Sequence, residues 1–442
     1  MLALNLLRKE PKALRVHRHR FTPTVTREER LFWTLNLLRE FCNACLQERR
    51  DAYRERKRLE ANGVDAKTLR ELRPELFVDR ATQSAALVEI KKLRPEYKQI
   101  HAQVLQDVVR RVDLAFQAFF RRLAAGETPG YPRFKGRDRY RSFTYPQPRE
   151  QGVKFCSGGK RLKLSGIGTI RVKFHRPARG ELRKVSVVHA SDGHWYVDLT
   201  YLGNAQHLPA TGHIAGSDAG ITDFAVVSSG PLADPEGRTC RTIDNPRFLK
   251  KGARRLRGAA RRLSRRPTHS RGREEAKALL GKQHSKIARQ RLDFHHKEAL
   301  KMVRGNDVIV VEAGLEGLAK GMLAKHVLDA GWGQYFRLLA YKAESAGREL
   351  VRVRASDTTV DCSRCGAPDP KTLADRVHEC TRCGLRIPRD RNSGREIRRR
   401  GMEALGLAGA RQSVLGAHSS HCRDAWGPCQ RSRNFARAEE SE

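Results

Sequence analysis

The sequence of 442 residues lacks a long apolar run, which argues against a membrane-spanning helix. Such a helix needs about 20 consecutive apolar residues. The chain also shows neither a Ser/His/Asp hydrolase signature nor a glycine-rich loop that would cradle phosphate groups. Its N-terminal segment becomes basic at residue 8, before an apolar stretch long enough for a secretory signal. We therefore expect a reducing, cytoplasmic environment without a membrane partner.

Acidic residues are scarce relative to basic ones. Lys and Arg number 88 against 49 Asp and Glu, which gives a formal net charge of +39. A folded chain tolerates this self-repulsion most readily beside a polyanion. Nucleic acid is the first candidate partner and an anionic membrane the second. The hydrophobic content of 39% is sufficient for packed cores, and the length suggests two to four structural units.

Cysteine is not scarce, and four of the ten cysteines form two C-x2-C pairs, in the pattern C-x2-C-x14-C-x2-C. In a reducing compartment this pattern indicates a metal site rather than disulfides. Four thiolates suit tetrahedral Zn²⁺, and a closed four-sulfur shell is structural because no position remains for substrate water. The predicted ligands are Cys362, Cys365, Cys380 and Cys383. A glycine follows the second cysteine of each pair, at Gly366 and Gly384, which favours a tight turn there.

The first half of the chain combines strands with helices. Residues 14–22 alternate apolar and basic side chains, as a half-buried strand does. Residues 26–125 show helical spacing, with Thr26 as the expected N-cap. Period-two alternation with glycine turns follows up to about residue 205. We expect a small antiparallel barrel that residues 14–22 complete, into which the helices are inserted.

The pattern of the second half predicts an α/β unit with three acidic residues as candidate site residues. Strand, helix and strand alternate from about residue 206 onward. Asp218 and Glu312 lie at the ends of apolar strands, and Asp390 precedes a helix. Acids at such places are costly unless they are paired or bound to metal. Taken singly, each fits a cap or a surface ion pair; three converging carboxylates would suit Mg²⁺.

The combination of three segments resembles the RuvC-like nuclease segments of the TnpB family of transposon-encoded, RNA-guided nucleases, which are related to miniature type V CRISPR effectors. These segments are GSDAGITDFAVVSSG, VIVVEAGLEGL and CSRCG…CTRCGLRIPRDRNSG. The segments YPRFKGRDRYRSFTY, RLDFHHKEAL and DAGWGQYFRLLAYKAESAGREL are also similar to parts of TnpB proteins. The resemblance covers most of the chain.

The resemblance implies a multidomain α+β and α/β fold: an OB-like β-barrel (wedge) with an inserted helical recognition lobe, then an RNase H-like RuvC nuclease domain with an inserted zinc ribbon. Asp218, Glu312 and Asp390 would be catalytic and would bind Mg²⁺. By resemblance to the family, two Mg²⁺ ions are expected. The corresponding expected ranges are 1–25 with 126–205 (wedge), 26–125 (recognition lobe), 206–358 with 386–405 (nuclease), 359–385 (zinc ribbon, binding target nucleic acid) and 406–442 (a loosely ordered tail).

The implied partners are a guide RNA and double-stranded target DNA. A heteroduplex is held by its backbone, so the protein needs a cationic channel. No acidic residue occurs between Asp244 and Glu274, which favours the basic run there over a merely solvated helix. Aromatic residues that alternate with cations near residue 131 suit stacking as well as ordinary packing. The expected nucleic-acid-binding residues are Lys250, Lys251, Arg254, Arg255, Arg261, Arg262, Tyr131, Arg133, Phe134 and Lys135.

The leading hypothesis is a Mg²⁺-dependent, RNA-guided DNA endonuclease that cuts next to a short motif read by the protein. One alternative is a nuclease-weak RNA-guided binder acting as a repressor or transposition accessory. Others are a miniature type V effector that uses a CRISPR RNA, and a conventional DNA-binding transposase without RNA. Departures from the family pattern lie close to the acids, at Ser217, Ala219, Pro388 and Ser393-Gly394.

Histidines and the C-terminal cysteines give weaker signals. His17 and His19 lie among strand arginines and are expected at the surface. His295 and His296 could support the nuclease core or serve packing alone. A second metal site is conceivable at His418, His421, Cys422 and Cys429, although the expected disorder of the tail argues against it.

Overall fold

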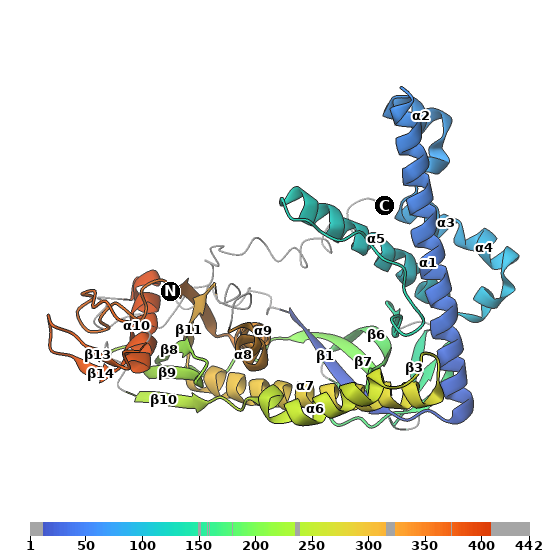
Figure 1. The fold of residues 1–442 in the computed structure, drawn as a ribbon. Helices are drawn as coiled ribbons and strands as arrows, with labels where there is room; N and C mark the ends of the chain where they lie inside the picture. Colours follow the sequence, from blue (N-terminus) through green and yellow to red (C-terminus); the bar gives the residue numbers. More distant parts are fainter. Residues whose placement is uncertain are drawn as a thin grey trace, which may run out of the picture.

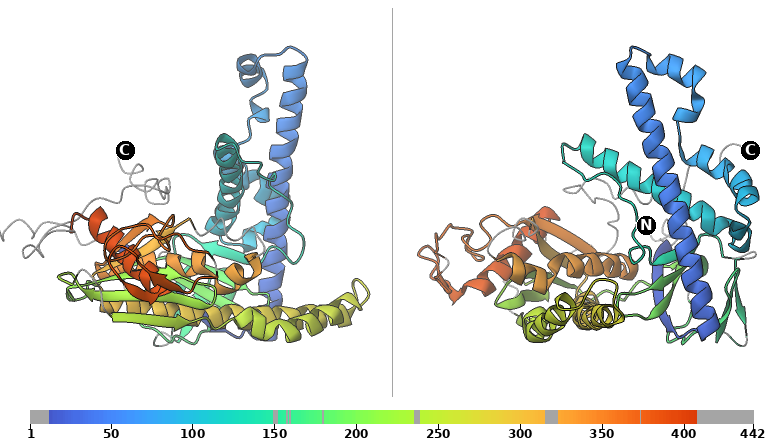
Figure 2. Two further views of the ribbon diagram at one scale, coloured as in Figure 1. Left: turned by 60° about the vertical axis from the view of Figure 1, so that its left-hand side comes forward. Right: turned by 45° about the vertical axis from the view of Figure 1, so that its right-hand side comes forward.

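The computed structural model describes residues 12–148, 152–156, 158, 160–178, 180–234, 239–314, 323–372 and 374–407. The chain forms a mixed α/β protein of several units (Figure 1). One end of a long helix projects away from the rest, and two sheets lie along a pair of antiparallel helices (Figure 2). Among the described residues, no helix is long and apolar enough to cross a membrane.

The first unit contains a four-stranded antiparallel sheet with strand order β1-β7-β6-β2. Its strands are β1 (Lys12–Phe21), β7 (Trp195–Asn204), β6 (Glu181–His189) and β2 (Ser142–Tyr145). As the alternation of residues 14–22 predicts, β1 pairs along its whole length with β7, from Lys12 opposite Asn204 to Phe21 opposite Trp195. A strand from the chain's beginning therefore depends on a strand nearly 200 residues later.

The predicted closed barrel is wrong for the described strands. β3 (Val153–Cys156), β4 (Arg161–Leu164) and β5 (Gly168–Arg171) form a separate three-stranded sheet. The two sheets share a hydrophobic core. Among the described residues, one isolated β-bridge joins them, between Phe21 and Val172. Strands of four residues are too short to continue the ladder around both sides of this core.

Five α-helices and two short 3-10 turns lie between β1 and β2 in the chain. The α-helices are α1 (Val25–Ala61), α2 (Ala66–Leu72), α3 (Arg80–Ala85), α4 (Leu87–Leu93) and α5 (Ala102–Ala124). The predicted cap at Thr26 is wrong by two residues, because α1 begins at Val25 and its N-cap residue is Thr24. The structure shows no side-chain hydrogen bond from Thr24 to the helix, so packing of the apolar face holds this end.

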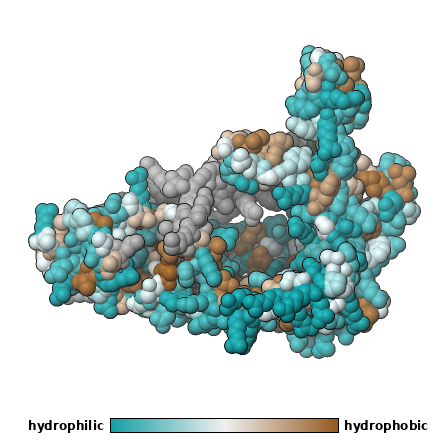
Figure 3. All heavy atoms as spheres, in the orientation of Figure 1, coloured by the Kyte–Doolittle hydropathy of each residue, from teal (hydrophilic) through white to brown (hydrophobic). Residues whose placement is uncertain are grey.

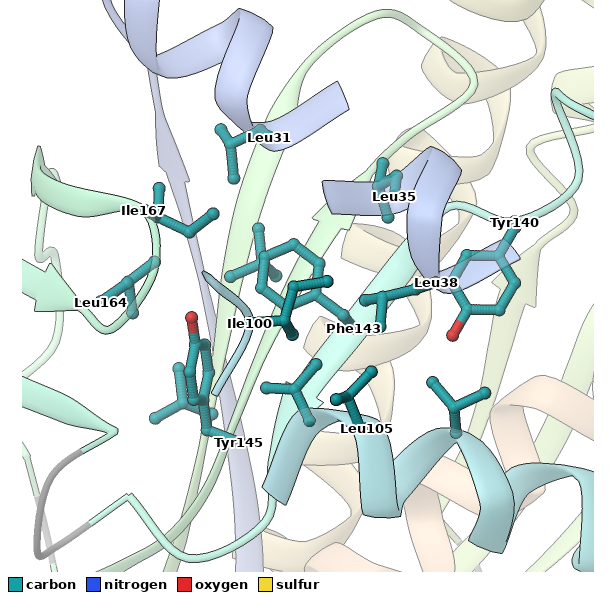
Figure 4. Packing of buried hydrophobic residues seen from close by; sticks show 14 of the residues in the cluster. Leu31, Leu35, Leu38, Ile100, Leu105, Tyr140, Phe143, Tyr145, Leu164 and Ile167 are labelled. Carbon is teal, nitrogen blue, oxygen red and sulfur yellow. The ribbon is translucent and has the colours of Figure 1, made fainter. Parts of the chain in front are cut away.

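The helices and the first sheet share one core. Leu31, Leu35 and Leu38 project from one face of α1 toward Phe143 and Tyr145 of the sheet, with α5 closing the cluster from the other side (Figure 4). Helical spacing of these leucines brings them to one stripe of the helix. The lower half of α1 is thereby fixed to the sheet, whereas residues beyond Ala52 in α1 contribute no buried side chain.

The second unit is built on a five-stranded sheet with strand order β10-β9-β8-β11-β12. β8 (His213–Ala219), β9 (Asp223–Pro231) and β10 (Thr239–Asp244) form an antiparallel meander. β11 (Val308–Ala313) then pairs parallel with both β8 and β12 (Glu349–Arg354). The apolar run VIVV predicts a buried strand, and β11 occupies an interior position with its side chains buried.

Helices cover both faces of this sheet. The helices of this unit are α6 (Phe248–Ser264), α7 (Arg271–Gly305), α8 (Ala324–Ala330), α9 (Trp332–Ala346) and α10 (Arg389–Ala404). On one face, Ile309 and Val311 of β11 pack in a cluster with residues of α7, α8 and α9. On the other face, Val308 and Val310 pack against α10. The sheet is thus a middle layer, and successive side chains of a strand pack alternately against the helices on its two faces.

Helix α7 joins the two units. Its Arg289 donates a 2.6 Å hydrogen bond to the buried carboxylate of Asp192, in the turn between β6 and β7. A Cβ added to Gly281 of α7 would meet the backbone oxygen of Ser191 at 2.0 Å. This close backbone approach and the ion pair together fix the orientation of α7 against the first sheet.

Helix α10 lies unusually close to the sheet because glycines form the contact. A Cβ on Gly216 of β8 would lie 2.4 Å from both the Arg398 amide nitrogen and the Gly394 carbonyl oxygen of α10. A Cβ on Gly401 would lie 2.2 Å from a methyl carbon of Val310. Since real Cβ contacts are longer, side chains at these positions would push the helix off the sheet.

We predict that Gly216→Ala destabilises the protein by about 1–3 kcal/mol, because its new methyl group meets backbone that cannot rotate away. Urea denaturation measures this change. Gly258→Ala in α6 is the matched control, since an added Cβ there meets nothing within 4 Å. The control should be stabilised by roughly 0.5–1 kcal/mol, as expected for alanine replacing glycine within a helix. Equal stability of both variants would contradict the close packing.

Candidate metal centres

The three predicted acids lie on the same side of the five-stranded sheet. Strand side chains alternate between faces, so Glu312 shares a face with Val308 and Val310, which pack against α10. By the same alternation Asp218 shares a face with Ile214, which also belongs to the α10 cluster. Asp390 is in the first turn of α10 itself. The fold therefore brings acids from three distant segments toward one another.

Glu312 is buried and held by a single hydrogen bond to a neighbouring side chain. Its residue is 8% exposed, and the hydroxyl of Thr358 donates to its Oε1 at 2.6 Å. Burial raises the pKa of this carboxyl, whereas the Thr358 hydrogen bond and the positive charge of Arg400 oppose the rise. No ion pair to Glu312 is found within the described ranges, so its charge lacks direct compensation.

Of the three acids, Asp218 has the pKa that is raised most clearly. Burial raises the pKa of its carboxyl well above the usual range, and the charges of Glu312 and then Asp390 raise it further. Arg389 opposes this rise. A neighbouring negative charge disfavours the ionised form of a buried carboxyl, so both causes act in the same direction on Asp218. A divalent cation would remove both the repulsion and the cost of burial.

Asp390 is more accessible than the other two acids, with 41% of its side chain exposed. The neighbouring Arg389 donates from Nε to its Oδ1 at 3.3 Å. Its place in the first turn of α10 puts the carboxylate at the positive end of the helix dipole. The Asp390 carboxylate is therefore reachable from solvent.

The acids form a looser group than the cysteines. In the part of the chain that the structure describes, one group of His, Cys, Asp or Glu has its ligand atoms all within 4.8 Å of one another, and it is the four cysteines. Whether Asp218, Glu312 and Asp390 bind metal stays a prediction.

The structure explains one departure from the family pattern. Gly394 of α10 faces the sheet, where an added Cβ would lie 3.2 Å from the Val226 carbonyl oxygen. The adjacent Ser393 is fully buried, and its hydroxyl donates to the Arg389 carbonyl at 3.2 Å. A glycine at position 394 thus allows the close approach of α10 to the sheet. Nothing in the structure explains Pro388.

The four cysteines lie together as the spacing predicts. Sγ of Cys362 is 3.6 Å from Sγ of Cys383, and Sγ of Cys365 is 3.5 Å from Sγ of Cys380. Tetrahedral zinc with bonds of about 2.3 Å requires sulfur atoms about 3.8 Å apart. The donor set and its dimensions therefore fit zinc, and the cluster could hold one such ion.

Two similar turns present these cysteines. Gly366 and Gly384 both have positive φ, of 71° and 69°, as expected for the glycines that follow each pair. Their amides donate to the carbonyls of Cys362 and Cys380. The hairpin of β13 (Val377–Glu379) and β14 (Arg386–Pro388) carries the second pair and leads directly into α10. The zinc ribbon thus lies between β12 and α10 in the chain.

The ribbon is bonded to α10 by one buried side chain. Asn392 donates from Nδ2 to the Asp361 carbonyl at 2.7 Å and accepts the Ser363 amide at 3.0 Å. Arg400 of the same helix contacts Asp361 and the Ser356 carbonyl. Roles for Thr358, Asn392 and Arg400 are not predictable from sequence patterns alone. The short spacing of Asp390 and Asn392 was the one available signal.

Helix α6 forms a cationic surface along one side of the protein. Its predicted contact residues are all exposed: Lys250, Lys251, Arg254, Arg255, Arg261 and Arg262. Within the described ranges, none of the six side chains forms a salt bridge with a carboxylate. Figure 3 shows this hydrophilic edge below a hollow whose upper boundary is α5.

The predicted aromatic contact segment is divided between surface and core. Phe134 is 42% exposed, and Arg133 and Lys135 are exposed beside it. Arg50 of α1 lies 4.8 Å from the Phe134 ring centre and 5.7 Å from that of Tyr131. Asn43 of α1 holds the backbone of Lys135 through both its amide and its carbonyl. The segment is therefore fixed against α1.

The remaining aromatic residues and the histidines serve packing. Tyr140, Phe143 and Tyr145 are buried in the first core. His19 is buried rather than at the surface, and its Nδ1 lies 3.2 Å from Nδ1 of His175. His295 is buried among aromatic rings, with Nε2 at 2.9 Å from the Ala330 carbonyl. The possible second metal site in the tail lies outside the described residues.

Comparison with known proteins agrees with these features. A family model described as "Probable transposase" matches residues 189–319, and one described as "Cas12f1-like, TNB domain" matches residues 332–397. A Streptomyces pristinaespiralis protein named as an RNA-guided DNA endonuclease is 30% identical over 398 residues, covering 88% of this chain and 90% of its own length. InsQ of Escherichia coli K12, named likewise, is 28% identical over 60% of this chain and 65% of InsQ.

The solved structures include a Cas12f1–sgRNA–target DNA complex, with 13% identity and a TM-score of 0.48 over 87% of this chain and 98% of that one. The similarity in sequence defines a class of transposon-associated nucleases related to Cas12 proteins. The chain belongs to the TnpB family, as its near-complete alignment with the Streptomyces protein shows.

We predict that the purified protein contains one zinc ion per chain and that Cys380→Ser removes it. Loss of a ligand leaves thiolates crowded without a cation, so the variant should unfold at a lower temperature. Elemental analysis and thermal unfolding measure the two effects. Cys240→Ser is the control, because Cys240 lies on β10, outside the cluster. Full zinc content in Cys380→Ser would contradict the assignment.

We predict that Asp218→Asn stabilises the metal-free protein at pH 8. A raised folded-state pKa contributes stability that is complete below the unfolded pKa of about 3.9 and is lost as pH rises through the folded value. Asparagine removes that loss, so the gain should disappear on acidification toward pH 4. Denaturation curves at several pH values measure it.

Exposed Asp244 on β10 supplies the control, since Asp244→Asn should change little at any pH. In wild type, added Mg²⁺ should raise the free energy of unfolding, and in Asp218→Asn this increase should be smaller. A variant less stable than wild type at pH 8 without metal would contradict the electrostatic account.

Proposed function

We propose that the chain is an RNA-guided DNA endonuclease whose Mg²⁺-dependent site consists of Asp218, Glu312 and Asp390. The observation that carries this proposal is the placement of the three acids on one face of the sheet, where Glu312 and Asp390 both raise the pKa of Asp218. Membership in the TnpB family supports it, because the Streptomyces and Escherichia relatives are named as RNA-guided DNA endonucleases. Acids brought together at the ends of two strands and the start of a helix would be a poor choice for stability alone.

The sheet supports an RNase H-like, RuvC-type assignment. Its order β10-β9-β8-β11-β12 combines an antiparallel meander of three strands with two parallel ones. Asp218 is near the end of β8, the strand at the centre of this order, and Glu312 is near the end of the adjacent parallel strand β11. Parallel neighbours end at the same edge, so the two acids meet there.

The chemistry of the donors fits the expected metal. Carboxylate oxygens are hard ligands of the kind Mg²⁺ prefers, and the raised pKa values of Asp218 and Glu312 indicate a need for positive charge. The three acids would hold two Mg²⁺ ions, which supply activation of water and stabilisation of the leaving oxygen of a phosphodiester. Asp390, whose side chain is 41% exposed, would be accessible to the incoming strand.

The proposed guide–target heteroduplex would lie beside the cationic surface of α6. Exposed lysines and arginines without acidic partners suit phosphate groups, and each contact releases counterions. The hollow between α5 and α6 in Figure 3 offers space bounded by both units. Base pairing would supply sequence specificity, so the protein needs to hold the duplex by its backbone.

The proposed division of labour follows the chain order. Residues 1–25 and 126–205 would form the wedge, and residues 26–125 would form the recognition lobe. Residues 206–358 and 386–405 would form the nuclease, interrupted by the zinc ribbon at 359–385. The wedge and recognition lobe would read the short DNA motif, and Arg133, Phe134 and Lys135 would contact nucleic acid at the junction held by Asn43.

Plasmid cleavage by the protein copurified with its RNA tests the proposal. Asp218→Ala and Glu312→Ala should each lower the cleavage rate by at least about a thousandfold, because removing one metal-binding acid removes the metal-supported chemistry. Target binding by both variants should remain within about threefold of wild type, since phosphate contacts supply the affinity.

Asp244→Asn serves as the control and should cut at the wild-type rate. Sequencing the copurified nucleic acid separates an RNA-guided protein from a transposase that carries no RNA. Undiminished cutting by Asp218→Ala would refute the assignment of the site, and wild type that binds its target without cutting would indicate a guided binder.

A further inference from the structure

The segment that connects β12 to the zinc ribbon contacts Glu312 and also the helix that carries Asp390. This connecting segment, residues 355–361, runs through consecutive turns and contains Asp357 with a positive φ of 62°. Amides of Val360 and Asp361 both bond the Asp357 carbonyl, which fixes the final turn. A short, internally bonded segment of this kind transmits the position of one end to the other.

Its first anchor is Thr358, which reaches Glu312. Thr358 is 2% exposed, and its hydroxyl lies 2.6 Å from Oε1 of Glu312 and 3.1 Å from the Ala355 carbonyl. Other hydrogen bonds to the Glu312 carboxylate are absent from the described residues. Because a glutamate side chain has three rotatable bonds, this contact decides which orientation the carboxylate adopts.

Its second anchor is Asn392, at the other end of the segment. Asn392 is fully buried, and its amide group uses one donor and its acceptor on Asp361 and Ser363, on either side of the zinc ligand Cys362. Asn392 also lies two residues after Asp390, within the start of α10. The first zinc knuckle and the turn that carries Asp390 are therefore bonded to each other directly.

A third anchor prevents the segment from moving independently of α10. Arg400 donates to the Ser356 carbonyl at 2.6 Å and to the Asp361 carboxylate at 2.7 Å. Its Nε donates to Oε1 of the buried Glu396 at 2.7 Å, which holds the guanidinium in place. The ribbon, the segment, Glu312 and α10 thus form one bonded unit.

We propose that Thr358 and Asn392 are positioning residues through which the zinc-bound ribbon sets the geometry of Glu312 and Asp390. The proposal rests on the proposed function, since it assigns these two acids to a catalytic metal site. Zinc fixes the knuckle of Cys362, and the knuckle fixes the amide of Asn392. Opening of the knuckle would leave that buried amide without partners, which is costly, and would release the first turn of α10.

The ribbon therefore has a second role besides contact with nucleic acid. Groups that orient metal ligands through hydrogen bonds commonly change metal affinity by 10- to 100-fold when removed. Zinc binding at the ribbon and divalent-metal binding at the acids should accordingly be coupled, although the two sites share no ligand.

The test compares Thr358→Val with Thr358→Ser in the full chain copurified with its RNA. Valine keeps the shape of threonine without the hydroxyl, whereas serine keeps the hydroxyl. Binding of Mn²⁺, followed by the electron paramagnetic resonance of the free ion, measures the acid site without relying on cleavage. We expect Thr358→Val to weaken Mn²⁺ binding about tenfold and Thr358→Ser to stay close to wild type. Zinc content should be unchanged in both.

The link to the ribbon is tested with Cys365→Ser and Asn392→Ala. Both should weaken Mn²⁺ binding, and combining Asn392→Ala with Cys365→Ser should add little, because the two changes break one connection. Full additivity would overturn the proposed route. Asp244→Asn again controls for the loss of a remote side chain.

The outcomes separate this inference from the proposed function. Wild type that binds no Mn²⁺ at the acids, with Asp218→Ala indistinguishable from it, would refute the proposed function itself. Wild-type binding that Asp218→Ala removes, combined with unchanged binding in Thr358→Val and Asn392→Ala, would overturn the inference alone. Weaker binding in Thr358→Val, restored in Thr358→Ser, would support the positioning role.

Discussion

The structure of the second unit depends on holding like charges together. Asp218, Glu312 and Asp390 come from a meander strand, a parallel strand and a helix, and their mutual repulsion opposes their meeting. Apolar packing on both faces of the sheet supplies the opposing stabilisation. The glycine contacts of α10 make the arrangement possible, because they let the helix that carries Asp390 approach the strand that carries Asp218. The acid site is thus a product of close backbone packing as much as of acidic residues.

Local patterns in the sequence predicted the elements well. The C-x2-C spacing and its glycines predicted two turns that present four sulfur atoms to one point, and the structure has both. The run VIVV predicted a buried strand ending in Glu312. Alternation in residues 14–22 predicted an isolated N-terminal strand that needs a sheet, and β1 pairs with β7. Such signals succeed because spacing along the chain alone determines them.

Features that depend on distant contacts were not predictable in the same way. Closure of a barrel depends on ladder lengths on both sides of a core, and β3 to β5 are too short. His19 alternates with arginines and yet is buried, because His175 from another segment covers it. Thr358 lies in no motif, and the segment that contains Asn392 does not indicate its bonding role, since a threonine or asparagine acquires its role from the partner that the fold supplies. The close contact at Gly216 is equally invisible, because its partner atoms belong to a helix about 180 residues later.

The absence of acidic residues along α6 affects the protein before it binds nucleic acid. No acidic residue of α6 neutralises its cations, so this charge stays uncompensated in a newly made chain until a polyanion binds. In the proposed function, a guide RNA bound along α6 would act as this counterion. Because such contacts recognise phosphate groups rather than bases, they would place little constraint on the RNA sequence.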